Sequence, residues 1–198
     1  IGGRTELETT FRSISRQFGD DSHVFSLSTG WKLPYYSANG SLFEFNAVAQ
    51  SDLFFVDNDT QDTNSNIQKN NEFGARIFPQ LGLKWVYPMF REAENTYQIL
   101  EPLINIVIAP NIIETSIMPN EDSRGFEYDN TNIFEFNRYS GINRLTEGSR
   151  IDYGIKGSSF ADNLLNYEFF FGQSYHLWGK NTFDHGSGLE DDFSDFVG

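Results

Sequence analysis

The sequence predicts an all-β protein: an antiparallel up-and-down segment of a transmembrane β-barrel, with about seven long strands and no closure of its own. Three observations predict this class. Apolar side chains recur at every second residue, which is the period of a β-strand. Most of these runs reach or exceed the roughly 9–11 residues that a tilted strand needs to cross a bilayer. The connections alternate in length, as they do in barrels with short turns on one side.

The first two elements in chain order differ in clarity. Residues 5–17 alternate only weakly, because Thr and Ser dilute the apolar side of the run. Residues 25–33 alternate clearly, with Phe25 and Trp31 on one side and Lys32 on the other. Both runs fit amphipathic strands better than helices, because the apolar period is two residues.

The next two elements show the pattern most strongly. Residues 43–55 place Phe45 on an apolar face and Glu44 on a polar one. Residues 73–89 keep one face apolar throughout, including Leu83, while Arg76 and Lys84 fall on the other face. We therefore expect two long neighbouring strands here.

The last three elements are residues 100–108, 150–156 and 165–175. A soluble antiparallel sheet with one wet face would show the same alternation. The length of the runs favours the membrane, as do the aromatic residues at their ends, Trp31, Trp85, Tyr87 and Tyr175. Parity then assigns candidate residues to the lumen face (Arg76, Lys84, Glu101, Arg150, Asp152) and to the lipid face (Phe45, Leu83, Ile106, Phe169).

The connections divide into two sets. Residues 34–40, 91–95 and 158–163 would lie on one side of the membrane, and residues 57–71, 110–148 and 177 onward on the other; only 17–22 fits poorly. Residues 126–136 alternate again inside the longest connection. That connection either contains a strand pair of its own or folds back on the wall.

Charge argues against nucleic acid. The 198 residues carry 14 Lys and Arg against 28 Asp and Glu, a net charge of −14, whereas nucleic-acid binders carry basic surfaces. The polar face of the proposed strands holds eight bases and eight acids, so the whole acidic surplus lies in the connections. A neutral wall of mixed charges suits a hydrated interior, although a solvated sheet face would tolerate it too.

We find no catalytic, metal or cofactor motif. The chain has no Cys, and its three His are scattered without the spacing of metal ligands. Residues 57–62 open like a calcium loop, but Asp62 stands where the loop needs Gly, and Gln68 where it needs Glu. We expect no enzymatic activity and no resident metal or cofactor.

One loop motif is followed by a family resemblance. Residues 119–123 read Pro119, Asn120, Glu121, Asp122 and Ser123, a turn-rich acidic stretch. Together with residues 126–154, the run 31–35, the run 76–88 and residues 99–102, it closely resembles the barrel domain of the LptD family, LPS-assembly proteins once called organic solvent tolerance proteins. The resemblance covers most of residues 22–198.

The resemblance implies a large barrel in the outer membrane of Gram-negative type, which inserts lipopolysaccharide into the outer leaflet without covalent chemistry. It implies three partners: lipopolysaccharide, an LptE-type lipoprotein plug in the lumen and a periplasmic Lpt bridge. Residues 1–198 would form the middle of that barrel, without the N-terminal jelly roll, the terminal strands of the lateral gate or the family's cysteines. Such a segment has two unpaired edges and should aggregate, pair or need detergent.

Two alternatives and one hypothesis accompany this interpretation. A general porin-like barrel shares the strand pattern, and a soluble all-β carbohydrate-binding module would have to tolerate long exposed apolar strands. As a hypothesis, acidic loop residues such as Glu121 and Asp122 share divalent cations with lipopolysaccharide phosphates, because both groups offer hard oxygen ligands. Solubility and repulsion between loops explain these acids equally well.

Overall fold

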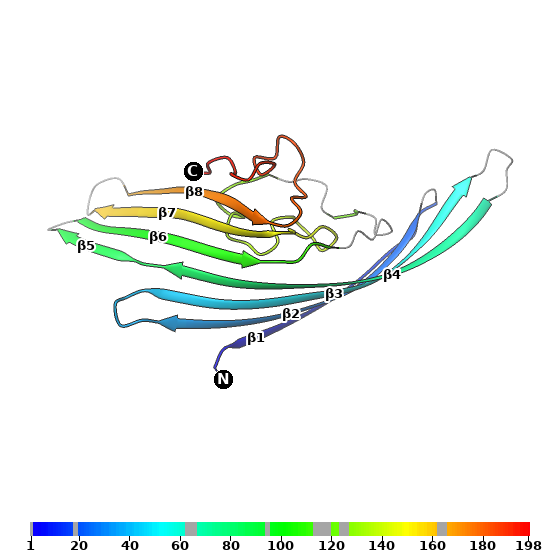
Figure 1. Cartoon of the computed structure of the whole chain (residues 1–198), viewed down its shortest axis with the longest axis horizontal. Helices are drawn as coiled ribbons and strands as arrows, with labels where there is room; N and C mark the ends of the chain where they lie inside the picture. The colour runs from blue at the N-terminus through cyan, green and yellow to red at the C-terminus, as the bar shows by residue number, and fades with distance from the viewer. Residues whose placement is uncertain are drawn as a thin grey trace.

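The computed structural model describes residues 2–17, 20–61, 67–93, 96–112, 120–122, 127–161 and 166–198, with the backbone alone for 58–61, 67–71 and 93. In these ranges the chain forms one sheet of eight strands (Figure 1). Their bounds are β1 (Arg4–Ile14), β2 (Asp21–Tyr36), β3 (Leu42–Gln61), β4 (Ile67–Val86), β5 (Met89–Ala93), β6 (Thr96–Ile108), β7 (Ser149–Ala161) and β8 (Tyr167–Trp178). None of the described residues belongs to a helix long and apolar enough to cross a membrane.

The sheet has the predicted topology. Its strand order is β1-β2-β3-β4-β6-β7-β8, every pairing is antiparallel, and β5 pairs with β6 off this path. Among the described strands nothing joins β1 to β8, so the sheet is open. The all-β, up-and-down, unclosed architecture is therefore confirmed.

Several boundaries of the prediction are wrong: β5 and β7 extend into the connections predicted at 91–95 and 158–163, and two larger differences stand out. The run 73–89 is interrupted after Val86, and Met89 begins the additional strand β5. Pro102 accounts for the break: it lies opposite Tyr87 and accepts from the Tyr87 N–H at 3.1 Å, but it has no N–H to donate in return. The connection 57–71 is mostly strand, because β3 and β4 stay paired out to Gln61 and Ile67. The sequence did not predict this extension of β3 and β4, because its polar side chains show no apolar alternation. The backbone hydrogen bonds form regardless of side-chain polarity.

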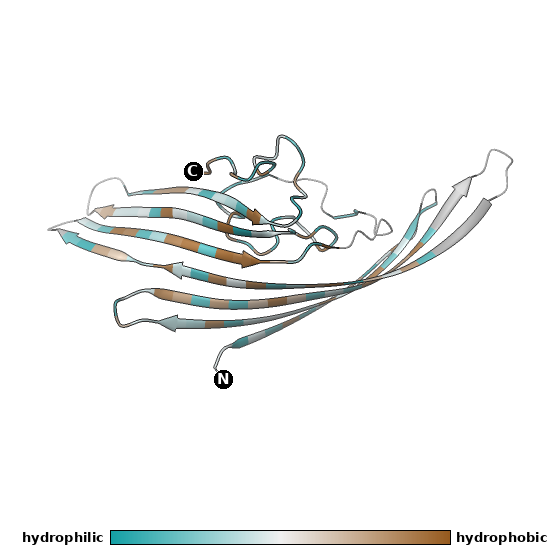
Figure 2. Cartoon of the chain, viewed as in Figure 1, coloured by the Kyte–Doolittle hydropathy of each residue, from teal (hydrophilic) through white to brown (hydrophobic). Residues whose placement is uncertain are grey.

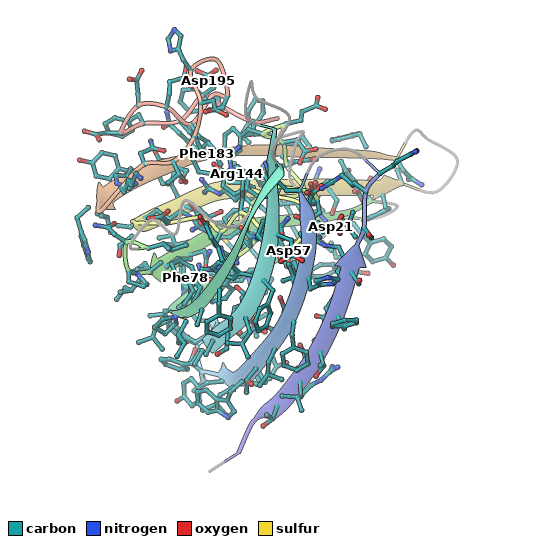
Figure 3. The ribbon with its side chains drawn as sticks, turned by 90° about the vertical axis from the view of Figure 1, so that its right-hand side faces the viewer. Asp21, Asp57, Phe78, Arg144, Phe183 and Asp195 are labelled. Carbon is teal, nitrogen blue, oxygen red and sulfur yellow. The ribbon has the colours of Figure 1, made fainter. Side chains whose placement is uncertain are left out.

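The sheet is long and twisted. Strands β3 and β4 have 20 residues each, or roughly 66 Å at about 3.3 Å per residue. Figure 3 shows β1–β4 and β7–β8 running in clearly different directions, as expected from the right-handed twist of strands. The connections β2–β3, β5–β6 and β7–β8 share one end, which we call the short-turn end; β3–β4 and the long β6–β7 connection share the other.

The two faces of the sheet differ in exposure. On β4, Ile77 and Leu81 are 75% and 57% exposed, whereas Phe78 and Gln80 are 1% and 4% exposed. Figure 2 shows the underlying alternation of hydrophobic and hydrophilic residues along the strands. Residues 127–148, which we call the inner segment, lie against the second face (Figure 1). The long connection thus folds back on the wall, one of its two expected conformations.

The buried core lies between the sheet and the long connection. Phe78, Ala109 and Leu145 form a buried cluster, and Ile112 packs against it. Phe54 and Ile133 are fully buried as well. We call the apolar, uncovered side of the sheet the outer face and the covered side the inner face.

The C-terminal residues meet the last strand. Bridges join Val197 to Gly172 and Phe193 to Tyr175. The N–H groups of Gly172 and Val197 each donate to the other residue's carbonyl oxygen, at 2.8 and 2.9 Å. Part of the β8 edge, expected to be unpaired, is therefore paired within this chain.

Candidate functional site

A buried ion pair lies on the inner face of β3 and β4. Asp52 and Arg76 are register partners on these strands, and Arg76 Nε donates to Asp52 Oδ2 at 2.7 Å. Ser26 Oγ of β2 donates to the other carboxylate oxygen at 2.6 Å. Each oxygen of the buried carboxylate thus has a donor, which is what keeps a buried charge tolerable.

This pair also binds the inner segment. Arg76 Nη1 and Nη2 donate to the carbonyl oxygens of Asn143 and Ile142, both at 2.8 Å. Gln50 Nε2 donates to the Ile142 carbonyl oxygen at 3.1 Å. One wall arginine therefore donates to two backbone carbonyls of the inner segment, and Gln50 adds a second donor to one of them.

A second buried cluster is centred on Asp152 of β7. Asn105 of β6 and Ser174 of β8 are its register partners and donate to its two carboxylate oxygens, at 3.0 and 2.7 Å. Arg150 Nε donates to Asp152 Oδ2 at 3.2 Å, and Arg138 of the inner segment donates to Oδ1. One fully buried carboxylate thus joins three strands to the inner segment.

The second cluster holds a different stretch of the inner segment. Arg150 donates to the carbonyl oxygens of Glu135 and Phe136. Gln80 donates to the Phe136 carbonyl at 3.3 Å, and Asn105 to the Phe134 carbonyl at 3.4 Å. The polar face of the wall therefore fixes the inner segment at two separated places.

The described part of the acidic loop motif is bound to β1 and the residues that follow it. Arg12 Nη1 donates to Asp122 Oδ2 at 2.6 Å, and Arg16 pairs with Glu121. The hydrogen bond to Glu121 raises the pKa of Arg16 above its ordinary value. Both carboxylates thus have protein partners, which leaves less of their charge for the hypothesised divalent cation. Asn120 is exposed, and Pro119 and Ser123 lie outside the described residues.

The structure distributes the remaining predicted residues between the two faces. Arg76, Arg150 and Asp152 are buried under the inner segment rather than lining an open lumen. Lys84 is half-buried, with Nζ 5.7 Å from the centre of the Phe134 ring. Glu101 is half-buried and opposite Lys156 in register. These five residues share the inner face.

The four residues assigned to the lipid face lie on the outer face. Phe45, Leu83 and Ile106 form one row across β3, β4 and β6. Phe45 and Phe169 are exposed, and Leu83 and Ile106 are half-buried. These four residues share one face of the sheet, and contact of that face with lipid stays a prediction.

Aromatic side chains gather toward the short-turn end. Trp85 and Tyr87 stack with ring centres 6.3 Å apart, and Phe90 and Tyr97 stack at 6.1 Å. Exposed aromatic residues of the neighbouring strands join them: Tyr35, Tyr36, Phe160 and Tyr167. By register, Tyr35, Trp85, Tyr87 and Tyr167 lie on the outer face, whereas Tyr36, Phe90, Tyr97 and Phe160 lie on the inner face. The four outer-face residues are placed as aromatic residues at a membrane interface are.

Sequence reasoning missed the inner-segment side of the site. Arg138 and Asn143 carry much of the contact to the wall, and both are buried. The available signal was strand register, because Asn105, Asp152 and Ser174 face one another only after β6, β7 and β8 are aligned. In the part of the chain that the structure describes, no group of three or more His, Cys, Asp or Glu could hold a metal ion.

Long antiparallel strands, an apolar outer face with an aromatic band and a polar inner face covered by chain define the class: a wall segment of an outer-membrane-type β-barrel. The comparison with protein families is specific. The family model LptD, LPS transport system D, matches residues 2–198. The chain belongs to this family, whose members are components of lipopolysaccharide transport to the outer membrane. No curated protein matches the chain.

Proposed function

We propose that this chain forms part of the wall of an outer-membrane barrel that inserts lipopolysaccharide into the outer leaflet, without covalent chemistry. The observation that carries the proposal is the division of one sheet into two faces: exposed apolar residues on one side, ion pairs and amides on the other. An apolar outer face suits acyl chains and a polar inner face suits sugars. A soluble carbohydrate-binding module would leave that outer face in water.

Within this proposal, the inner-face residues differ in whether they are exposed enough to contact sugars. Arg76, Arg150 and Asp152 bind the inner segment, so their role in the proposal is to hold it against the wall. Lys84 and Glu101 lie nearer the short-turn end and keep some exposure. Polar parts of lipopolysaccharide entering from that end would meet Lys84 and Glu101 first.

The proposed orientation places the short-turn end in the periplasm, because barrels of this class have their short turns there. Strands of the rest of a larger barrel would pair with the edge of β1, and with the edge of β8 once the C-terminal residues that bridge Gly172 and Tyr175 leave that edge. An LptE-type lipoprotein in the lumen and a periplasmic Lpt bridge complete the proposal. Support for these partners is family membership alone.

Crosslinking in the assembled full-length complex tests the proposal. A photoreactive side chain at Lys84 should form an adduct with lipopolysaccharide, whereas the same group at the buried Arg76 should react with the inner segment instead. If no lipopolysaccharide adduct forms at Lys84 while lipopolysaccharide is being transported, the proposed path along the inner face past Lys84 is wrong. That result would favour the porin-like alternative.

A further inference from the structure

We propose that the outer face of β5–β8 carries a binding site for one glycerophospholipid, with its phosphate at Arg91. This inference goes beyond lipopolysaccharide transport but rests on the membrane placement proposed above. It starts from a groove of about 360 Å³ at the short-turn end. The residues that line it and carry the argument are Met89, Arg91, Gln98, Leu100, Tyr167 and Phe169.

Strand register arranges these side chains in two rows. Arg91, Gln98, Ser159 and Tyr167 are successive register partners across β5, β6, β7 and β8, so their side chains share one face. Two residues further along each strand, the partners are Met89, Leu100, Gly157 and Phe169. The first row is polar and lies nearer the chain turns; the second is apolar.

The next row continues the apolar surface toward the middle of the sheet. Pro102, Ile155 and Phe171 are register partners there, and Phe171 is 59% exposed. Successive rows are about 6.6 Å apart, twice the rise per residue. A polar row followed by apolar rows along the strands matches a phospholipid, with its head group at the interface and its acyl chain in the hydrocarbon.

Gly157 lies between Leu100 and Phe169 in this row, and its missing side chain lets the Phe169 ring lie against the sheet. A Cβ atom at Gly157 would lie 2.3 Å from the Phe169 ring, so the ring rests directly on the glycine backbone. The Phe169 ring therefore forms an apolar part of the groove lining, and a larger residue at position 157 would displace the ring. This feature distinguishes it from the flat lipid contact that any barrel surface makes.

Arg91 supplies the charge complementarity. Its guanidinium is exposed and has no carboxylate partner among the described residues. Gln98 and Tyr167 beside it are exposed and add further donors. A guanidinium with free donors at the level of an aromatic band is suited to a phosphate, which it can bind through two parallel hydrogen bonds.

The test measures bound lipid on the assembled full-length complex. The complex is reconstituted in nanodiscs of phosphatidylethanolamine and phosphatidylglycerol, transferred to mild detergent, and analysed by native mass spectrometry. Wild type should retain one phospholipid per barrel. Arg91→Gln should weaken retention roughly ten-fold, the size expected for losing hydrogen bonds to a charged group. Arg91→Lys should retain more than Arg91→Gln, and Gln98→Trp should lose lipid by filling the groove.

Arg4→Gln is the matched control, because Arg4 is an exposed arginine at the far edge of the sheet on β1. Equal phospholipid retention by wild type, Arg91→Gln and Gln98→Trp would overturn the site. Retention of lipopolysaccharide in place of phospholipid would overturn the assigned occupant. The Lys84 crosslink to lipopolysaccharide, measured on the same variants, reports on the proposed transport separately, so failure of the phospholipid site can be distinguished from failure of the proposed transport path.

Discussion

At the residue scale, the described wall depends on a few buried charges. Asp152 is 0% exposed and receives donors from Arg138, Arg150, Asn105 and Ser174. Such a pair adds little net stability compared with a well-packed apolar replacement, but removing one partner leaves the other charges buried and uncompensated. The cluster therefore acts mainly by specifying where the inner segment binds.

Asp152→Asn should lower the free energy of unfolding by about 3–5 kcal/mol, because it leaves two buried guanidinium groups without a negatively charged partner. Urea unfolding of the full-length protein in detergent, followed by tryptophan fluorescence, measures the change. Asp184→Asn is the control: that carboxylate is 86% exposed and lies 3.6 Å from Arg144, so its loss should cost at most about 1 kcal/mol. Similar costs for the two variants would argue against a buried cluster at Asp152.

Glu190 gives a pH dependence outside the strands. Hydrogen bonds from backbone N–H groups, its own first and then those of Gly186 and Gly188, lower its pKa from the ordinary 4.5 to about 2. A carboxyl whose pKa falls on folding contributes stability above its unfolded pKa and loses it as the pH falls through the folded value. The turn 186–190 should therefore keep its hydrogen bonds to the Glu190 carboxylate at pH 5 and lose them as the pH approaches about 2.

NMR titration of the amide protons of Gly186 and Gly188 measures this directly, since both donate to the Glu190 carboxylate, at 2.9 and 2.8 Å. In Glu190→Gln the low-pH transition of these amides should vanish. If the pH transition of these amide protons in the unmodified protein has its midpoint near the ordinary pKa of 4.5, the N–H groups do not stabilise the Glu190 carboxylate.

At the element scale, the sequence predicted the strands well and their contacts poorly. The run 73–89 gave β4 and its two faces, because exposed Ile77 and buried Phe78 obey the two-residue period. The same period could not predict that residues 57–61 belong to a strand, because their side chains are polar on both faces and show no alternation. The inner segment was beyond sequence reasoning, because Arg138 meets Asp152 only after strands distant in sequence are aligned.

Glycine makes close strand packing possible on β4. A Cβ atom at Gly74 would lie 2.1 Å from the ring of its register partner Phe54, which is fully buried and has no room to move. Gly74→Ala should destabilise the protein by about 1–3 kcal/mol through overpacking. In the control Gly30→Ala, the nearest atom, of Glu6, lies at an ordinary 3.8 Å.

Thermal unfolding of the two glycine variants, followed by circular dichroism in detergent, provides the comparison. Gly74→Ala should melt at a clearly lower temperature than Gly30→Ala. Equal melting temperatures would mean that Phe54 does not pack on the Gly74 backbone.

At the scale of the whole molecule, the described chain is an open sheet whose inner face is partly filled by its own long connection and C-terminal residues. Tyr139 and Phe183 stack with ring centres 4.9 Å apart, and Arg144 lies over the Tyr139 ring. These contacts tie the C-terminal residues to the inner segment. Passage of a substrate along the inner face would therefore require the inner segment to move or to leave a path beside it.

The central claim is that the outer face of this sheet contacts lipid. Spin labels placed singly at residues 73–84 of the full-length protein in bilayers test it most directly. The account predicts that labels at Phe73, Ile77 and Leu81 are accessible to oxygen but not to a polar nickel reagent, while labels at Phe78 and Gln80 are shielded from both. Access of the nickel reagent to Phe73, Ile77 and Leu81 would place them in water and contradict the account.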